Sequence, residues 1–281
     1  MSNYPLPTEL LVLITGFASQ STLASLALTS KTISALSIIP LYTSIPQMDA
    51  PRAVQCLGTL ATNTRLAQLV RSYYLVESTE FDDSRSLSEV IAVALENMIG
   101  LTELFLSLGP NFSSEVLRRA TFKLQGLTCM ITQPHSEHSI ARFLNHQRTI
   151  KSLYLFCHPE SLSSLSPDAL PALKGITAPL RLLPYIVPIN LSHITHISVL
   201  GTIADPNNLG ELAMIFESAP TPPVTPIECM LGLDFRGPAM HVENVSRGLS
   251  LLGQIAPWIR SLRLEVHQGQ VERVKYDSTI T

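Results

Sequence analysis

A short apolar run recurs along the chain from residue 70 onward. Each full run has apolar residues at its first, fourth and sixth positions, as in Leu101-x-x-Leu104-x-Leu106 and Ile150-x-x-Leu153-x-Leu155. Two partial runs also occur. The second apolar position of each full run, and its equivalent in the partial runs, is residue 73, 104, 127, 153, 173, 197, 231 or 262. Their intervals of 20 to 34 residues predict a stack of repeated units with one strand in each unit.

Amphipathic segments lie between several of these runs and predict helices. Ser86 is expected to begin one helix, Asn207 to cap a second and Asn244 to begin a third. A helix followed by a strand is expected in four stretches, near residues 86–107, 137–156, 207–235 and 244–266. This alternation predicts an α/β fold with a parallel sheet and helices on one side.

Prolines interrupt the pattern between residues 167 and 190. The five prolines there predict loop or extended structure, because proline lacks the N–H that helices and inner strands use. They are Pro167, Pro171, Pro179, Pro184 and Pro188.

The N-terminal segment has a different pattern, that of three short helices. Pro7 fits a first helical position and Glu9 its first turn, and Leu10, Leu13, Ile14 and Phe17 follow at helical spacing. Thr29-Ser30 offers a cap for the third helix, and Pro40 is expected to end it. Three helices in about forty residues have too little interior to bury their own apolar surface, so a binding partner is implied.

Three blocks in this segment carry a family resemblance. They are Leu6-Pro7-x-Glu9-Leu10-Leu11-x-x-Ile14, Leu23-x-x-Leu26-x-Leu28-Thr29-Ser30-Lys31, and Leu41-Tyr42. Together they resemble an F-box of the fungal type across roughly residues 4–46. The segment departs from many F-boxes in having Ser30-Lys31-Thr32-Ile33 where those carry Cys-Arg/Lys-x-Trp.

The resemblance implies a substrate-recognition subunit of an SCF-type ubiquitin ligase. Its partners would be the Skp-type adaptor of the cullin complex and an unidentified protein substrate. The resemblance places Leu6, Pro7, Leu10, Ile14, Leu26 and Tyr42 on the adaptor face, with Glu9 and Lys31 at its polar rim. The later repeats resemble the degenerate leucine-rich-repeat region that often follows fungal F-boxes, an irregular α/β solenoid with a parallel sheet.

This interpretation divides the chain into four parts. Residues 4–46 form the F-box and 47–66 a linker helix, 67–268 form the repeat region that binds the substrate, and 269–281 are a polar tail. Because side chains alternate along a strand, the residues between the buried leucines are expected on the opposite, exposed face. The candidate target-binding residues on that face are Phe105, Tyr154, Phe156, Asp234, Arg236, Arg263 and Glu265.

Composition narrows the class of partner and the compartment. The formal net charge is −3 and no long basic run occurs, which argues against nucleic-acid binding. No 18 consecutive residues are apolar, so no membrane span is expected. Cys56, Cys129, Cys157 and Cys229 form no C-x-x-C pair and are expected to be buried thiols in a reducing compartment, the cytoplasm or the nucleus.

No catalytic motif was found, and no cofactor is predicted. Neither a phosphate-binding glycine loop, nor G-x-S-x-G, nor H-E-x-x-H occurs. His135-x-x-His138 and His193-x-x-His196 have a spacing seen in metal sites, but no second ligand pair accompanies them, so no metal is expected. We therefore expect a non-catalytic adaptor. The alternatives are an interaction scaffold outside any ligase and an enzyme with an unrecognised site.

Overall fold

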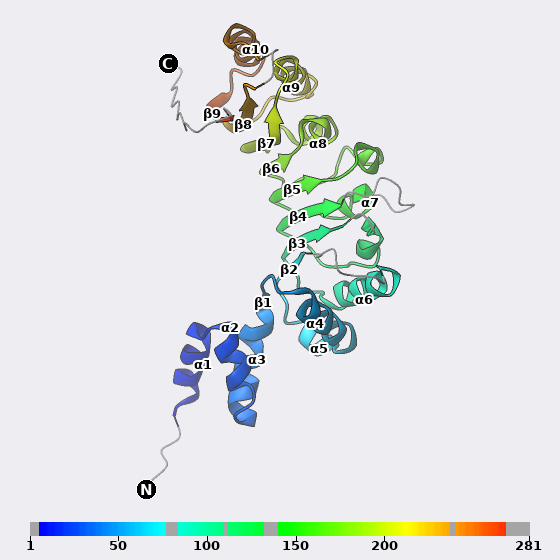
Figure 1. Cartoon of the computed structure of the whole chain (residues 1–281), viewed down its shortest axis with the longest axis vertical. Coiled ribbons are helices and arrows are strands. Elements are labelled where there is room, and N and C mark those ends of the chain that lie inside the picture. Colours follow the sequence, from blue (N-terminus) through cyan, green and yellow to red (C-terminus); the bar gives the residue numbers. More distant parts are fainter. Residues whose placement is uncertain (1–5, 77–83, 110–111, 132–139, 237–239, 268–281) are drawn as a thin grey trace. The chain divides into compact units, whose positions relative to one another are not determined.

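A computed structural model describes residues 6–76, 84–109, 112–131, 140–236 and 240–267 (Figure 1). Within these residues, nine strands form one parallel sheet in chain order from β1 to β9, accompanied by helices. The prediction of an α/β fold with a parallel sheet is therefore confirmed. The chain forms two compact units, residues 1–105 with 119–122 and residues 106–118 with 123–281.

The first unit begins with three helices, α1 (Thr8–Phe17), α2 (Gln20–Leu26) and α3 (Lys31–Thr43). The Ser30 hydroxyl accepts a hydrogen bond from the N–H of Ile33 and caps α3, as predicted. The Ser19 hydroxyl does the same for α2 by accepting from the N–H of Thr22. Pro7 stands just before α1 and not at its first helical position.

Pro40 does not end the third helix, contrary to the prediction. It lies inside α3, which continues to Thr43. A proline ring removes the hydrogen bond to the carbonyl four residues earlier and crowds that carbonyl, but it leaves the hydrogen bonds of later residues intact, so part of a turn can follow it. The Thr43 hydroxyl supports that last turn by donating a 2.7 Å hydrogen bond to the carbonyl of Ile39.

The segment after α3 enters the sheet at once. β1 (Ser44–Ile45) pairs in parallel with β2 (Ser72–Val76), and Ile45 is buried. Between these strands lie α4 (Ala50–Thr62) and α5 (Thr64–Ala67), and α6 (Ser84–Asn97) follows β2.

The helix expected as a linker belongs to the core of the first unit. α4 packs on α6 and buries Ala53, Leu57 and Leu60. The Asn97 amide at the end of α6 donates hydrogen bonds of 3.0 and 2.9 Å to the carbonyls of Leu60 and Ala61. These contacts fix the end of α4 against α6.

The remaining elements alternate between strands and helical segments, with β3 running across the division between the units. The strands are β3 (Glu103–Leu108), β4 (Gly126–Ile131), β5 (Ser152–Phe156), β6 (Gly175–Ala178), β7 (His196–Ile203), β8 (Ile227–Asp234) and β9 (Ile259–His267). The α-helices are α7 (Ile140–Leu144), α8 (Leu183–Asn190), α9 (Asn207–Glu217) and α10 (Val242–Ile255). Short 3-10 helices span Ser114–Leu117, Pro159–Leu162 and Leu180–Leu182.

The strand register corrects two of the predicted repeat positions. Residues 127, 153, 176, 197, 229 and 262 are consecutive partners across β4 to β9, so the repeats are 26, 23, 21, 32 and 33 residues long. Leu173 was expected at the centre of a strand, but it is a buried residue of the loop before β6, where Ile176 takes that position. In β8 the equivalent position is Cys229 and not Leu231.

Several helix boundaries also differ from prediction. α6 begins at Ser84 and α10 at Val242, each two residues earlier than expected. α9 does begin at Asn207, but the Asp205 carboxylate accepts the N–H of Asn207 there, at 2.9 Å.

The proline-rich stretch contains a helix that the sequence analysis did not predict. Pro184 lies in the first turn of α8, where a missing N–H costs nothing, and Pro188 lies near its end. Leu183, Ile186 and Val187 are buried on this helix, so packing outweighs the low helix propensity of proline.

Helices α7 to α10 cover one side of strands β4 to β9 in the second unit and leave the other side open (Figure 1). Residues pointing towards the helices, such as Leu155, Ile197 and Leu231, are fully buried. On β5 and β7 the neighbours of these residues point to the open side of the sheet and are half-buried or exposed.

Candidate functional site

The apolar face of α1 points to solvent. Leu10, Leu13, Ile14 and Phe17 recur at helical spacing and so share one face of α1, here called the α1 stripe. All four are between 45% and 90% exposed. The opposite side of the helix packs on α3, with Thr15 buried and Leu11 half-buried. An amphipathic helix normally buries its apolar face, so this orientation leaves the α1 stripe available to a partner.

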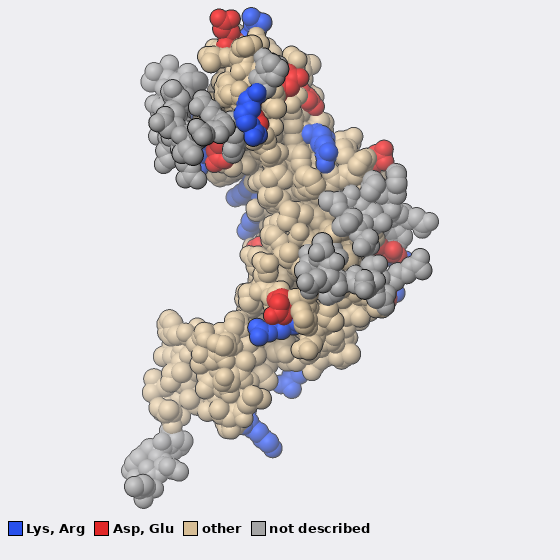
Figure 2. Space-filling model, viewed as in Figure 1, with Lys and Arg blue, Asp and Glu red and all other residues tan. Residues whose placement is uncertain are grey.

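Further apolar side chains are exposed on the same three-helix segment. They are Leu6, Val12, Leu28 and Ile39, and Leu28 is 88% exposed. Glu9 and Lys31 are the only charged residues between positions 6 and 48. The side of α1 to α3 visible in Figure 2 is correspondingly almost free of charged side chains. Large exposed apolar patches on soluble proteins mark interaction sites.

The structure places most of the predicted adaptor-binding residues on this surface. Leu10 and Ile14 belong to the α1 stripe, and Leu6 and Pro7 are exposed just before the helix. Glu9 lies exposed in the first turn, and Lys31 is exposed at the start of α3.

Tyr42 and Leu26 differ from the other candidates in being half-buried. Burial, and to a smaller extent the Cys56 thiol of α4, raise the pKa of Tyr42. Because its ring is already partly covered, Tyr42 is a weaker candidate for a partner contact.

Five exposed apolar residues of the three-helix segment were missing from the predicted adaptor-binding set. They are Leu13, Phe17, Val12, Leu28 and Ile39. The spacing of Leu13 and Phe17 from Leu10 was a sufficient signal for the first two. Leu28 and Ile39 have no such signal, because their exposure depends on how α2 and α3 pack.

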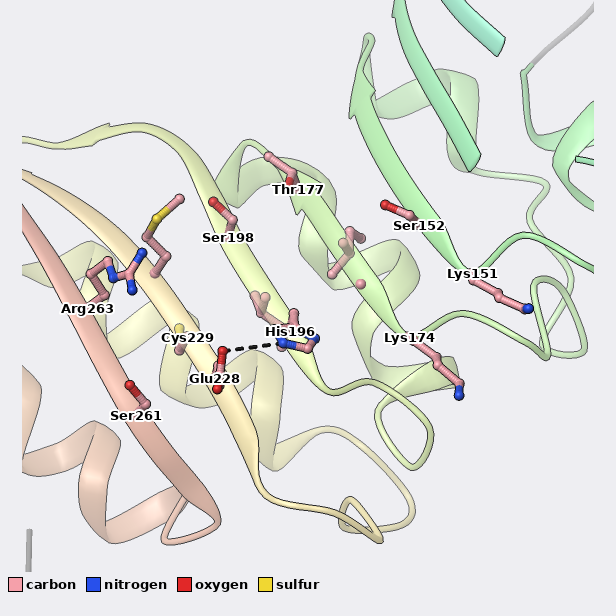
Figure 3. Close-up of a pocket in the computed structure, with 14 residues that line it drawn as sticks. Lys151, Ser152, Lys174, Thr177, His196, Ser198, Glu228, Cys229, Ser261 and Arg263 are labelled. Atoms are coloured by element: carbon pink, nitrogen blue, oxygen red, sulfur yellow. Dashed lines mark ion pairs between the residues drawn. The ribbon is translucent and has the colours of Figure 1, made fainter. Parts of the chain in front are cut away.

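The open side of the sheet in the second unit carries a groove of about 470 Å³ across strands β5 to β9 (Figure 3). Its lining includes Lys151, Lys174, His196, Glu228 and Arg263. Ser152, Gly175, His196, Glu228 and Ser261 are register partners on the five strands, so they form one row across the groove.

His196 and Glu228 form an ion pair in the middle of that row. The Nε2 atom of His196 lies 3.3 Å from a carboxylate oxygen of Glu228 (Figure 3). On its other side, Nδ1 of His196 lies 2.7 Å from the Thr195 hydroxyl. These two contacts fix the imidazole ring and direct the Glu228 carboxylate towards it.

Among the predicted target-binding residues, Arg263 alone lines this groove. Tyr154 and Phe156 are half-buried on β5, and the guanidinium of Arg181 lies 5.4 Å from the centre of the Phe156 ring. Glu265 is exposed on β9. Phe105 belongs to the first unit, where its ring stacks on Tyr74 at 5.3 Å.

Asp234 was predicted to be exposed, and this was wrong. Its side chain is only 11% exposed, because Arg236 folds back over it. Arg236 donates to Asp234 from Nε at 2.8 Å, from Nη2 at 2.6 Å and from its backbone N–H at 3.0 Å. These hydrogen bonds raise the pKa of the Arg236 guanidinium. The pair stabilises the turn after β8, so Asp234 is better described as a structural residue.

The cysteines are poor nucleophiles in this fold. Burial raises the pKa of Cys157 and of Cys229 to about 12, and it raises the pKa of Cys129 still further. Cys56 is partly exposed, with a pKa raised to about 11 by burial. A thiol reacts as its thiolate, so these pKa values disfavour covalent chemistry at neutral pH.

The described residues contain no cluster of three or more histidines, cysteines or carboxylates able to hold a metal ion. His193 and His196 lie within them, and His196 is engaged by Glu228 and Thr195. His135 and His138 lie outside the described residues, as does the predicted polar tail. No helix in the described part of the chain is long and apolar enough to cross a membrane.

No protein-family model matches this chain, and no curated protein matches it either.

Proposed function

We propose that this protein is a non-catalytic, substrate-recruiting subunit of an SCF-type ubiquitin ligase. The α1 stripe is the observation that carries the proposal, because a helix with its apolar face in solvent requires a partner. The sequence of the same segment resembles an F-box, whose partner is the Skp-type adaptor.

The chemistry of the surface suits a largely apolar interface. Burying a Leu, Ile or Phe side chain contributes about 1.5–3 kcal/mol, so the four residues of the α1 stripe can offset much of the cost of association. Glu9 and Lys31 supply charges at the margin, where they favour orientation more than affinity. Leu13, Phe17 and Leu28 extend the proposed adaptor face beyond the residues that the resemblance indicated.

The second part of the proposal is an irregular leucine-rich-repeat-like solenoid that holds the target. Parallel strands in chain order, at spacings of 21 to 33 residues, support it. The open side of strands β5 to β9 is the proposed target-binding surface. The mechanism is proximity, because tethering a target raises the effective concentration of its lysines at the ubiquitin-loading enzyme.

Co-purification with a Skp-type adaptor tests the proposal. The test variant changes Leu6, Pro7 and Ile14 to Ala, Ala and Asp. The control variant, Met214→Asp, places the same charge on an exposed apolar residue of α9 in the second unit.

We expect the wild type and the control to retain the adaptor and the test variant to lose it, with all three folded by circular dichroism. A folded wild type that retains no adaptor would overturn the proposal and favour the scaffold that acts outside any ligase.

A further inference from the structure

We propose that the groove across β5 to β9 binds an acidic peptide segment of the target in an extended conformation. This inference rests on the proposed function, since it names the class of target segment that the repeat surface recognises. Its basis is the arrangement of charges along the groove.

Two lysines stand side by side at one end of the groove. Lys151 and Lys174 directly precede β5 and β6, and the N–H of Lys174 donates a 2.8 Å hydrogen bond to the carbonyl of Lys151. Both side chains are exposed and extend in the same direction (Figure 3). Neither has a carboxylate partner among the described residues. Like charges on neighbouring strands destabilise one another, so an anion between them would be stabilising.

Arg263 supplies a third cation at the other end of the groove, on β9. The acidic residue between these ends is Glu228, and its carboxylate is already directed to His196. Among the described residues that line the groove, three are cations and one is a carboxylate that already has a partner. This local excess is opposite in sign to the formal net charge of −3 for the whole chain.

The strand spacing sets the length of the segment. Lys174 directly precedes β6 and Arg263 lies on β9, so the two residues are three strand spacings, about 14 Å, apart across the sheet. The strand register also offsets Arg263 from Lys174 by three residues, about 10 Å, along the strands, which makes the separation about 17 Å. An extended peptide covers that distance in about five residues. The expected segment has two acidic residues near the lysines and a third acidic residue about five positions further on. Hydroxyls of Ser152, Ser198 and Ser261, which also line the groove, can bond to the peptide backbone.

The test is a binding titration of the full chain with a fluorescent, capped peptide of about ten residues. The probe carries three glutamates at the expected spacing, and the control peptide carries glutamines in their place. The test variant is Lys151→Glu with Lys174→Glu. The matched variant is Arg142→Glu with Arg247→Glu, which changes the net charge equally at exposed residues of α7 and α10.

We expect the glutamate peptide to bind at least tenfold more tightly than the glutamine peptide. The lysine variant should lose about tenfold or more in affinity, and the arginine variant should lose less than threefold. Affinity should also fall as salt is raised, because the charges are exposed.

Three results would overturn the inference. The first is equal binding of the glutamate and glutamine peptides, and the second is an equal loss of affinity in the lysine and arginine variants. The third is binding only when the glutamates are replaced by phosphoserines, which would identify the groove as a phosphate-binding site. Peptide binding does not involve the adaptor, so its failure is distinguishable from failure of the proposed function. The lysine variant should still co-purify with the adaptor.

Discussion

The backbone N–H of Arg71 donates a 2.8 Å hydrogen bond to the carbonyl of Thr43, the last residue of α3. β1 begins at the next residue, with Ser44 and Ile45 as parallel partners of Ser72 and Tyr73 in β2. The three-helix segment is thus joined to the sheet of the first unit by backbone hydrogen bonds and not by a loose tether.

This junction should contribute measurably to stability. Ile45→Ala is expected to lower the free energy of unfolding by about 2–5 kcal/mol, because it leaves a cavity at a buried position. Ile39→Ala removes the same atoms from an exposed position of α3 and should change the free energy of unfolding by about 0.5 kcal/mol or less. Urea unfolding followed by circular dichroism measures both values, and equal effects would refute a packed junction.

Two glycines of α10 should respond to alanine in opposite directions. A Cβ atom at Gly248 would lie 2.8 Å from Cδ1 of Leu209 on α9, so Gly248→Ala should destabilise the protein by about 1–3 kcal/mol. At Gly253 a Cβ would meet nothing within 4 Å, so Gly253→Ala should stabilise it by about 0.5–1 kcal/mol. Thermal unfolding gives the sign of each change, and stabilisation by Gly248→Ala would disprove the close helix contact.

Thiol reactivity should follow burial and pKa. With iodoacetamide at pH 8 all four cysteines should react slowly, and as the pH approaches 11 Cys56 should be alkylated first. Peptide mass spectrometry identifies the labelled residue, and unfolding in urea should make all four reactive. Fast labelling of Cys129 in the folded protein would contradict its burial.

The same pKa shifts predict a loss of stability in alkali. The folded state holds the thiol protons of Cys157 and Cys229 up to a pH of about 12, whereas an unfolded thiol loses its proton near its ordinary pKa. Their contribution to the free energy of unfolding is therefore complete below pH 9 and is lost as the pH rises towards 12. Urea unfolding at pH 8 and pH 10.5 should give a lower free energy of unfolding at the higher pH. An unchanged free energy of unfolding would contradict the retention of the thiol protons in the folded state.

The sequence predicted the repeated strands because a buried strand position must be apolar. It could not separate Leu173 from Ile176, since a buried loop residue and a buried strand residue look alike in a pattern of apolar spacing. It also gave Pro40 and Pro188 too much weight, because tertiary packing allows both to lie inside helices.

The candidate surfaces were predictable to different degrees. The spacing of Leu10, Leu13 and Phe17 identified the apolar face of α1, but only the packing on α3 shows that this face points outward. Lys151 and Lys174 are separated by 23 positions in the sequence, and only the strand register brings them together. Side-chain alternation placed Asp234 on the open side without showing that Arg236 covers it.

Binding of the adaptor by the α1 stripe is tested most directly by calorimetry with the purified full chain and a purified Skp-type adaptor. The affinity is measured for the wild type and for a double variant, Leu13→Asp with Phe17→Asp. Both residues are exposed in the free protein, so this variant should unfold at the same urea concentration as the wild type. We expect the wild type to bind with a negative heat-capacity change, which marks apolar burial, and the variant to lose at least a hundredfold in affinity. Equal affinity of the two proteins, or no binding by a folded wild type, would contradict it.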